Sequence, residues 1–285
     1  MSERADAVLR VVWTGCFAVI LTAAISLVWG VLLTLNLRTG GAFPWAVAPM
    51  ALVLWMVWTF LGGRWGLPRS QAARRRLLRS RRLPRPVLFW ALAAGLLWMG
   101  SLAGLWIVLH RLMPVQTNPL PALSEYPAVT GVVALAMASI SGAVSEEAAY
   151  RGYFLSALER AGLGRSAVLL AALVMAPQHA LSQGFVWPNM LFYFLFDGMQ
   201  GAITFVTRSI RPGIATHTIG LFVFFYFIWP RDAGRTLISA SGPDLWFWVR
   251  LGQTAVCGAL SLAAFTYLTR LAREARAKND LGEIC

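Results

Sequence analysis

Two adjacent glutamates and an arginine interrupt the segment SISGAVSEEAAYRGYF, residues 139–154, which is otherwise uncharged. Between residues 127 and 158 the chain carries no charge other than Glu146, Glu147 and Arg151. A charge inside a bilayer costs about 3 kcal/mol on insertion scales, so such a side chain usually faces a cavity or a partner. Carboxylates at this depth are therefore candidates for acid–base chemistry.

Helical spacing separates the two glutamates. Glu147 and Arg151 are four residues apart with the acid on the N-terminal side, which on an α-helix favours an ion pair. Glu146 points about 140° away from Arg151 around such a helix, so the arginine does not serve both acids. A partly desolvated carboxylate is a stronger base than one in water, as catalysis near neutral pH requires. We therefore interpret Glu146 as a candidate general base, and Glu147 with Arg151 as a stabilising or supporting ion pair.

The segment that carries these residues is long for a membrane span. As a single α-helix, residues 127–158 would be about 48 Å long, against a hydrocarbon core of about 30 Å. We expect this helix to tilt, to bend at Gly142 or Gly152, or to continue into the cytoplasmic interface. The glutamates would then lie toward the cytoplasmic end of the span, close to the membrane surface.

Histidines supply companions for such a base, and the chain has three. His110 directly precedes Arg111 after an apolar segment, and we interpret it as an interfacial residue on the outer side. His179 comes two residues after Pro177, whose ring would kink a helix and free a backbone carbonyl. His217 lies early in a later apolar segment. One intramembrane histidine is usually a packing residue, but two of them together with a candidate base indicate a polar site.

The elements that must position these side chains are membrane helices. The chain of 285 residues is 58% hydrophobic and 13% charged, with a mean hydropathy of +0.63, which is typical of a polytopic membrane protein. Little polar sequence lies outside the apolar segments, so we predict an all-α fold of about eight transmembrane helices around a buried polar site. The expected spans are 8–37, 44–61, 87–109, 127–145, 166–181, 189–207, 212–229 and 245–269.

A strongly basic loop sets the expected orientation. Residues 64–85 contain nine arginines, and the positive-inside rule places such a loop in the cytoplasm. Alternation of the spans then puts both termini on the cytoplasmic side, and we expect a multi-pass protein of the cell (inner) membrane. The net charge of +13 is concentrated beside the spans, which favours anionic lipids as partners and argues against nucleic acid.

Three short patterns together resemble a known family. The sequence SEEAAYR, residues 145–151, matches the EExxxR motif of the CAAX prenyl endopeptidases, the Rce1-like or Abi-type (CPBP) intramembrane proteases. The family's FxxxH motif corresponds to residues 175–179, with Met175 in place of phenylalanine. Its last motif, HxxxN or HxxxD, corresponds to residues 217–221. The resemblance covers residues 127–229, which we expect to form the core, between N-terminal helices in 1–126 and a last helix with a basic cytoplasmic tail in 230–285.

The resemblance implies a role for each matching residue. Glu146 would activate water with the help of His179, while Glu147 and Arg151 would shape and support the site. His217 would stabilise the oxyanion together with the residue four positions later. In this interpretation the chain is an intramembrane endopeptidase, a hydrolase that cleaves a peptide or membrane-protein substrate near the cytoplasmic membrane face, and no cofactor is expected.

The chain departs from the family at Leu221, because leucine donates no hydrogen bond. Loss of one oxyanion donor typically costs about a hundred- to thousand-fold in rate. Either another polar side chain takes its place, or this member is slow or silent. Asp197, in mid-span where the family pattern has no carboxylate, could pair with an arginine, line the cavity or replace the missing polar residue. Other candidate donors are Gln178, Asn189, Gln200 and Thr218.

Other functions compete with the protease. A silent relative would serve as a membrane scaffold or a self-immunity protein, which the leucine permits. A transporter or channel would use the buried acids and histidines as a proton relay, but the sequence lacks the inverted repeats typical of transporters. A zinc site of two histidines and one glutamate is a further alternative, although no HExxH helix is present. Adjacent glutamates would also point about 100° apart on an α-helix, so one of them at most would bind the metal easily.

Overall fold

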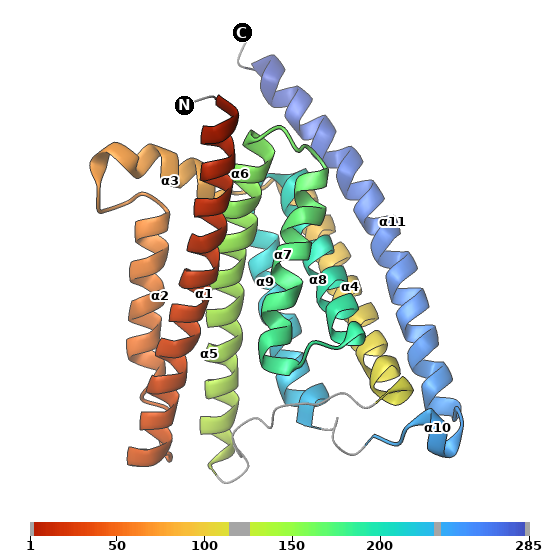
Figure 1. Cartoon of the computed structure of the whole chain (residues 1–285). Coiled ribbons are helices and arrows are strands. Elements are labelled where there is room, and N and C mark those ends of the chain that lie inside the picture. Colours follow the sequence, from red (N-terminus) through yellow and green to blue (C-terminus); the bar gives the residue numbers. More distant parts are fainter. Residues whose placement is uncertain (1–2, 114–125, 231–234, 283–285) are drawn as a thin grey trace. The chain divides into compact units, whose positions relative to one another are not determined.

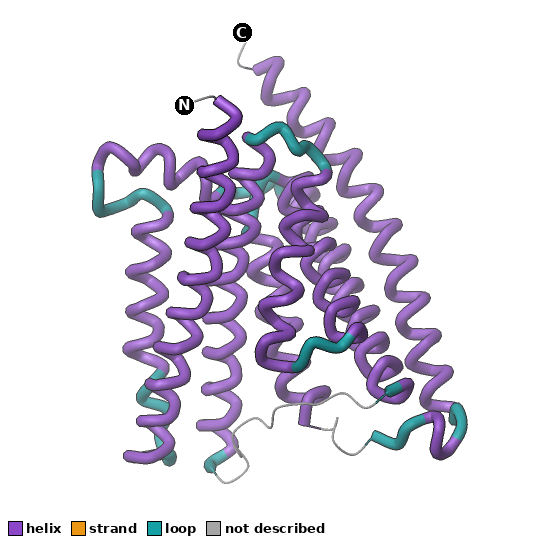
Figure 2. The backbone as a smooth tube through the Cα atoms, in the orientation of Figure 1, coloured by secondary structure: helices purple, strands orange, loops and turns teal. Residues whose placement is uncertain are grey.

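The protein is built from helices (Figure 1, Figure 2). The computed structural model describes residues 3–113, 126–230 and 235–282, and no strand occurs within these ranges. The all-α prediction is confirmed for this part of the chain. The α-helices are α1 (Glu3–Gly40), α2 (Val47–Leu61), α3 (Gln71–Leu78), α4 (Arg85–Leu112), α5 (Ala128–Glu146), α6 (Leu155–Arg160), α7 (Ser166–Gln183), α8 (Trp187–Thr207), α9 (Arg211–Val223), α10 (Ile238–Ser241) and α11 (Leu245–Gly282). A 3₁₀ turn η1 (Pro68–Ser70) and two π-helices, η3 (Glu147–Phe154) and η4 (Phe224–Ile228), complete the set.

Six helical segments are long and apolar enough to cross a membrane, counted within the described residues. The protein is therefore a multi-pass membrane protein. Two further apolar helices, Val47–Leu61 and Ser166–His179, are shorter. A span needs about 20 apolar residues, so the predicted count of eight spans is not confirmed, although each expected span coincides with an apolar helix. The six segments are Ala5–Gly40, Arg85–Leu112, Ala128–Arg160, Trp187–Thr207, Arg211–Ile228 and Leu245–Ala277.

The helices group into two compact units. The division cuts α9 between Thr216 and His217, so this helix contributes to both units. The expected division of the chain into segments 1–126, 127–229 and 230–285 follows sequence order rather than these units, and it stays a prediction. The first unit comprises Met1–Ser80, Asn118–Ala167 and His217–Pro230; the second comprises Arg81–Thr117, Val168–Thr216 and Arg231–Cys285.

In the first unit, α1 packs along the helical run that begins with α5. The ring of Phe154 fills the space beside Gly15, where an added methyl group would lie 3.2 Å from the ring. Phe17 lies against Tyr153, with 5.4 Å between their ring centroids. The start of α1, α3 and α6 lie at the same end of this unit (Figure 1). A buried apolar cluster joins α2 to α1 and α5, and it contains Ile25, Trp29, Ala46, Met50, Leu54, Ala134 and Met137.

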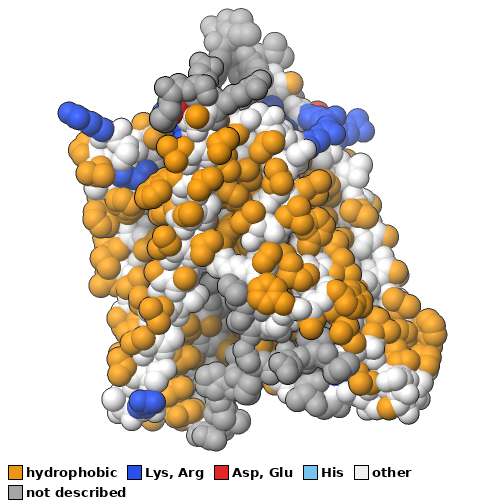
Figure 3. Space-filling view, in the orientation of Figure 1, with side chains coloured by type: hydrophobic (Ala, Val, Ile, Leu, Met, Phe, Trp, Pro, Cys, Tyr) orange, Lys and Arg blue, Asp and Glu red, His pale blue; other side chains and the backbone are white. Residues whose placement is uncertain are grey.

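The outer surface of α1 and α2 is apolar. Trp13, Leu27 and Trp55 expose 72%, 68% and 61% of their surface. In Figure 3 hydrophobic side chains cover the length of α1 and α2, while basic side chains gather over α3. Large exposed apolar patches mark surfaces that contact a membrane or a partner. In a bilayer, these side chains would contact lipid acyl chains, which are as apolar as leucine.

Some arginines of the basic loop have structural roles. Arg74 is buried and holds the turn after α2, because it donates to the carbonyls of Phe60 at 2.9 Å and Trp65 at 2.7 Å. Arg79 follows the last residue of α3 and pairs with Glu159 of α6 at 2.7 Å. These contacts attach α3 to its neighbours, so the loop is more than a solvated basic face.

The second unit is organised by α4 and α11, which lie side by side. Ser101 of α4 donates to the carbonyl of Thr254 in α11 at 2.8 Å, and such small polar residues let membrane helices approach closely. A further loop arginine, Arg81, donates to the carbonyl of Thr207 at 2.7 Å. Arg81 therefore caps the C-terminal end of α8, where free carbonyls favour a cation.

The interpretation of His110 as an interfacial residue is wrong. The side chain is 5% exposed, and its Nδ1 lies 3.0 Å from the carbonyl oxygen of Trp106, one turn earlier in α4. The two rings also lie against each other, with 4.3 Å between centroids. Because its own helix supplies both a hydrogen-bond partner and an aromatic face, the imidazole is accommodated inside the protein.

Candidate active site

The two glutamates lie where one type of helix gives way to another. α5 ends at Glu146, and the π-helix runs from Glu147 to Phe154 before α6 continues to Arg160. A π-helix has i→i+5 hydrogen bonds and therefore more residues per turn than an α-helix, and such segments are frequent at functional sites. The sequence-based separation of the two glutamates assumed regular α-helical spacing, which does not apply across this junction.

Gly142 and Gly152 permit close packing within the first unit. A methyl group added to Gly152 would lie 3.2 Å from the carbonyl oxygen of Leu78, so the C-terminal end of α3 packs directly on the π-helix. A methyl group added to Gly142 would lie 3.1 Å from Leu221. The run from Ala128 to Arg160 stays helical across both glycines. Their role in this structure is to let a neighbouring segment approach.

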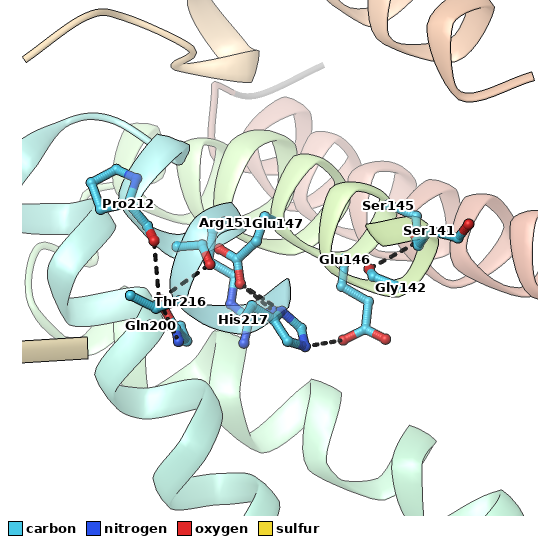
Figure 4. Close-up of polar contacts among 11 residues, drawn as sticks. Ser141, Gly142, Ser145, Glu146, Glu147, Arg151, Gln200, Pro212, Thr216 and His217 are labelled. Atoms are coloured by element: carbon cyan, nitrogen blue, oxygen red, sulfur yellow. Dashed lines mark hydrogen bonds and ion pairs between the residues drawn. The ribbon is translucent and has the colours of Figure 1, made fainter. Parts of the chain in front are cut away.

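His217 lies between the two glutamates (Figure 4). Its Nδ1 is 3.1 Å from Oε1 of Glu147, and its Nε2 is 3.7 Å from Oε2 of Glu146. Adjacent side chains on a regular α-helix diverge by about 100°, which favours only one glutamate facing any given group. The structure differs from that expectation, because both carboxylates face one imidazole, one at each ring nitrogen.

The cluster of Arg151, Glu147, His217 and Glu146 is deeply buried except at Glu146. Arg151 lies 3.5 Å from Oε1 of Glu147, as their spacing predicts. The side chains of Glu147, Arg151 and His217 are 0%, 2% and 1% exposed, whereas that of Glu146 is 17% exposed. Removing one partner of a buried ion pair lowers folding stability by about 3–5 kcal/mol. We therefore expect the loss of any of the three buried side chains to destabilise the protein. Glu146 is the member of the cluster with accessible surface.

Glu147 faces one ring nitrogen of His217. A carboxylate only accepts hydrogen bonds, so opposite the carboxylate form of Glu147 the Nδ1–H of His217 is the hydrogen-bond donor. Nε2 then faces Glu146, as an acceptor in the neutral ring and as a donor in the imidazolium. Orientation of an imidazole by a buried carboxylate is also the device of the Ser-His-Asp triad. The arrangement is thus suited to acid–base chemistry.

Leu221 borders the same group. A methyl group added to Gly142 would lie 3.1 Å from Cδ1 of Leu221 and 4.0 Å from Oε1 of Glu146, so both side chains flank this glycine. Leu221 is one helical turn beyond His217 in α9. The position at which the family pattern has asparagine or aspartate therefore lies near the candidate base, and in this chain it presents a methyl group.

His179 belongs to the second unit. Its ring stacks on Tyr193 of α8, with 4.2 Å between centroids and 15° between the ring planes. Pro177 lies inside α7, which continues to Gln183, so the proline does not end the helix. The stack holds the imidazole plane against α8. The expected meeting of His179 with Glu146 stays a prediction.

Three other polar candidates of the second unit, Asn189, Asp197 and Gln200, are buried, whereas Gln178 is half-buried. Nδ2 of Asn189 donates to a backbone carbonyl at 3.2 Å, and Asp197 is 2% exposed in α8. Nε2 of Gln200 lies 3.2 Å from Oγ1 of Thr216, and both side chains are fully buried. The sequence gives no sign that Thr216 belongs to this group, because threonine is common in membrane helices. Only the contact with Gln200 in the structure identifies it. Among the described residues, no group of three or more His, Cys, Asp or Glu side chains is arranged to hold a metal ion.

Comparison with known proteins identifies this region. Residues 128–223 match the family described as type II CAAX prenyl endopeptidase Rce1-like. No curated protein and no solved structure matches the chain. The matched residues include Glu146, Glu147, Arg151, His179 and His217, and the resemblance inferred from the three motifs is confirmed. Residues 128–223 are thus similar to the Rce1-like family of type II CAAX prenyl endopeptidases, and the chain is a membrane protein with a CAAX-protease-like region.

Proposed function

We propose that the chain is an intramembrane endopeptidase in which Glu146 activates the attacking water. One observation carries the proposal: two carboxylates flank the imidazole of His217, and of these Glu146 alone keeps accessible surface, with 17% of its side chain exposed. Glu147, which pairs with Arg151, holds the imidazole, while Glu146 has accessible surface for the reaction. The family match of residues 128–223 supports a hydrolase.

The proposed reaction follows from these positions. Glu146 accepts a proton from water, and the resulting hydroxide adds to the carbonyl carbon of the scissile peptide bond. The carbonyl electron pair moves to oxygen, and Nε2–H of the His217 imidazolium donates a hydrogen bond to this oxyanion. When the oxyanion re-forms the C=O bond and the C–N bond breaks, Glu146 returns its proton to the departing amine. Glu147 accepts from Nδ1 throughout and partly offsets the cost of the imidazolium charge inside the protein. The resemblance to the family implies that His179 assists the activation of water.

Leu221 leaves the oxyanion with one donor fewer than the family pattern supplies. Such a loss typically costs about a hundred- to thousand-fold in rate, so we expect a slow protease. The alternative function is a catalytically silent membrane scaffold or self-immunity protein. The same leucine favours it, because an apolar side chain stands beside Glu146 where the family has a polar one.

We further propose the setting of this reaction. The substrate is a peptide or membrane protein that is cut at the cytoplasmic face of the cell (inner) membrane, with both chain termini cytoplasmic. Within the first unit, the start of α1 and the arginine-bearing α3 lie at the same end as α6, which supports a common side for all three. Glutamate-activated water requires neither a metal ion nor another cofactor.

The test uses the full-length protein purified in detergent and two fluorogenic peptides of one sequence, one farnesylated at its cysteine and one not. We expect slow cleavage of at least one peptide, unaffected by EDTA and abolished in Glu146→Gln. Glu274→Gln is the matched control, because this glutamate pairs with Arg270 on the exposed part of α11. Full activity in Glu146→Gln would refute the assignment of the base. Loss of activity in EDTA that zinc restores would refute the metal-free mechanism, and an inactive wild type would favour the scaffold.

A further inference from the structure

Four arginines from three helical elements gather at one end of the first unit. They are Arg10 in α1, Arg76 in α3, Arg79 directly after α3, and Arg160 at the end of α6. The positive charge of Arg160 interacts unfavourably with the charges of the other three. Arg10, Arg76 and Arg160 are exposed. Arg10 and Arg160 lie outside the basic loop of residues 64–85, so this cluster is a product of the fold and not of the loop sequence.

Packing of the backbone brings these elements together. The hydroxyl of Ser156 in α6 donates to the carbonyl of Leu77 in α3 at 3.2 Å. On the other side, the ring of Phe154 packs against Gly15 of α1, where an added methyl group would lie 3.2 Å away. The buried contacts therefore fix where the arginine-bearing ends of α1, α3 and α6 lie within the unit (Figure 1).

Among the side chains that the structure describes, positive charge exceeds negative charge in the cluster. Glu159 pairs with Arg79 at 2.7 Å, and Asp6 lies one helical turn before Arg10. In this described part, four guanidinium groups thus accompany two carboxylates, and like charges held close together are unfavourable unless an anion joins them. Arginine forks bind phosphate oxygens in a bidentate manner, which makes phosphate the best-matched anion.

Arg79 shows that the cluster is held in place against an energetic cost. Its backbone has φ of 53°, a left-handed conformation that residues other than glycine adopt only where their surroundings hold them. Burial lowers the pKa of its guanidinium from the usual value of 12.5 to about 10. A poorly hydrated cation of this kind gains more from an added anion than a fully solvated one does.

The surface beside the cluster is apolar, which decides between a lipid and a soluble anion. Leu9 and Trp13 flank Arg10 on α1 and expose 59% and 72% of their surface. Tryptophan is enriched at the level of the lipid headgroups, where its ring meets both chains and polar groups. The phosphate group of a phospholipid can bind the arginines while the acyl chains of the same lipid cover Leu9 and Trp13. A free phosphate ion would leave these apolar side chains uncovered.

We propose that Arg10, Arg76, Arg79 and Arg160 form a binding site for the phosphate group of an anionic phospholipid. The site is independent of the proposed protease function, since none of its residues belongs to the candidate active site. It also differs from general attraction between a basic loop and an anionic membrane surface, because it requires arginines from α1 and α6 as well as α3.

The test measures binding of fluorescent phosphatidylglycerol to the full-length protein in neutral detergent, with fluorescent phosphatidylcholine as the comparison. We expect preference for phosphatidylglycerol in the wild type, and about fivefold weaker binding for each arginine removed in Arg10→Gln, Arg160→Gln and the double variant. The matched control is the double variant Arg64→Gln/Arg69→Gln, which removes two exposed loop arginines outside the cluster and should leave the affinity unchanged.

Three results would overturn the proposal. Equal losses in the two double variants would show diffuse attraction to a basic surface. Displacement of the labelled lipid by millimolar inorganic phosphate would show a site for the free anion. Equal affinity for phosphatidylglycerol and phosphatidylcholine would show that the site does not recognise the net negative charge of the lipid headgroup. Thermal unfolding of each variant separates binding from folding, and either single variant suffices for the comparison if the double variant does not fold.

Discussion

The buried ion pair predicts that the two neighbouring glutamates differ in what they do for stability. Glu147→Gln keeps the shape of the side chain and an acceptor for Nδ1 of His217, but it removes the negative charge beside Arg151. That arginine is 2% exposed, so its charge would remain inside the protein after losing the carboxylate of Glu147. Glu146→Gln removes a charge from a side chain that is 17% exposed and lies 3.7 Å from the imidazole.

The expected magnitudes follow from these environments. Removing one partner of a buried pair costs about 3–5 kcal/mol, and we expect the lower end because 3.5 Å between Arg151 and Glu147 exceeds the length of a strong charged hydrogen bond. For a chain of this size, a loss of about 3 kcal/mol corresponds to a fall in Tm of about 10 °C. Glu146→Gln should cost less than about 1 kcal/mol, since the amide keeps the size of the side chain and its hydration.

The assay is thermal unfolding of the purified protein in detergent, followed by the fluorescence of its 13 tryptophans. A third variant, Glu147→Gln/Arg151→Met, removes both charges and should recover part of the lost stability, because the buried cation that lost its pair with Glu147 is then absent. Equal Tm values for the two single variants would refute the division of labour. If the double variant is no more stable than Glu147→Gln, the stability lost in Glu147→Gln comes from the altered contact with His217 and not from the charge of Arg151.

Three further predictions concern other parts of the chain. Leu221→Asn should raise the rate of cleavage by about tenfold or more through an added oxyanion donor, measured with the fluorogenic peptides; no gain in an active protein means that another group already supplies this donor. Gly63→Ala should lower Tm well beyond Gly162→Ala: both glycines have positive φ, but only at Gly63 would the methyl group meet backbone, 2.2 Å from the carbonyl oxygen of Gln71. A reporter fused at residue 75 should lie in the cytoplasm, and a periplasmic or external location would invert the proposed topology.

Features that depend on local pattern could be predicted from the sequence. Apolar segments predict the helices, because a backbone in lipid must satisfy its hydrogen bonds within the segment. The i,i+4 spacing of Glu147 and Arg151 predicts their ion pair, which forms at 3.5 Å. The three motifs predict the family, and residues 128–223 match it. Each of these inferences uses residues that are close in sequence or whose order along the chain is diagnostic.

Features that depend on contacts between distant segments could not be predicted. His110 stands beside Arg111 at the end of an apolar segment, yet its side chain is 5% exposed and its Nδ1 lies 3.0 Å from the carbonyl oxygen of Trp106. Among loop arginines that look alike in sequence, Arg74 is an internal support whereas Arg64 is exposed. Which role an arginine takes depends on the carbonyls and carboxylates that the fold places within its reach.

The π-helix is the clearest case, because the expected division of roles between Glu146 and Glu147 assumed a regular α-helix, which the protein does not have at this junction. Regular α-helical spacing assigns Glu146 and Glu147 different directions, and from direction it assigns different functions. In the structure both carboxylates reach His217, at 3.7 Å and 3.1 Å, so direction does not separate them. Burial does. Glu147 is enclosed with Arg151 and lies against His217, whereas Glu146, the last residue of α5, keeps the accessible surface that its proposed role as a base requires.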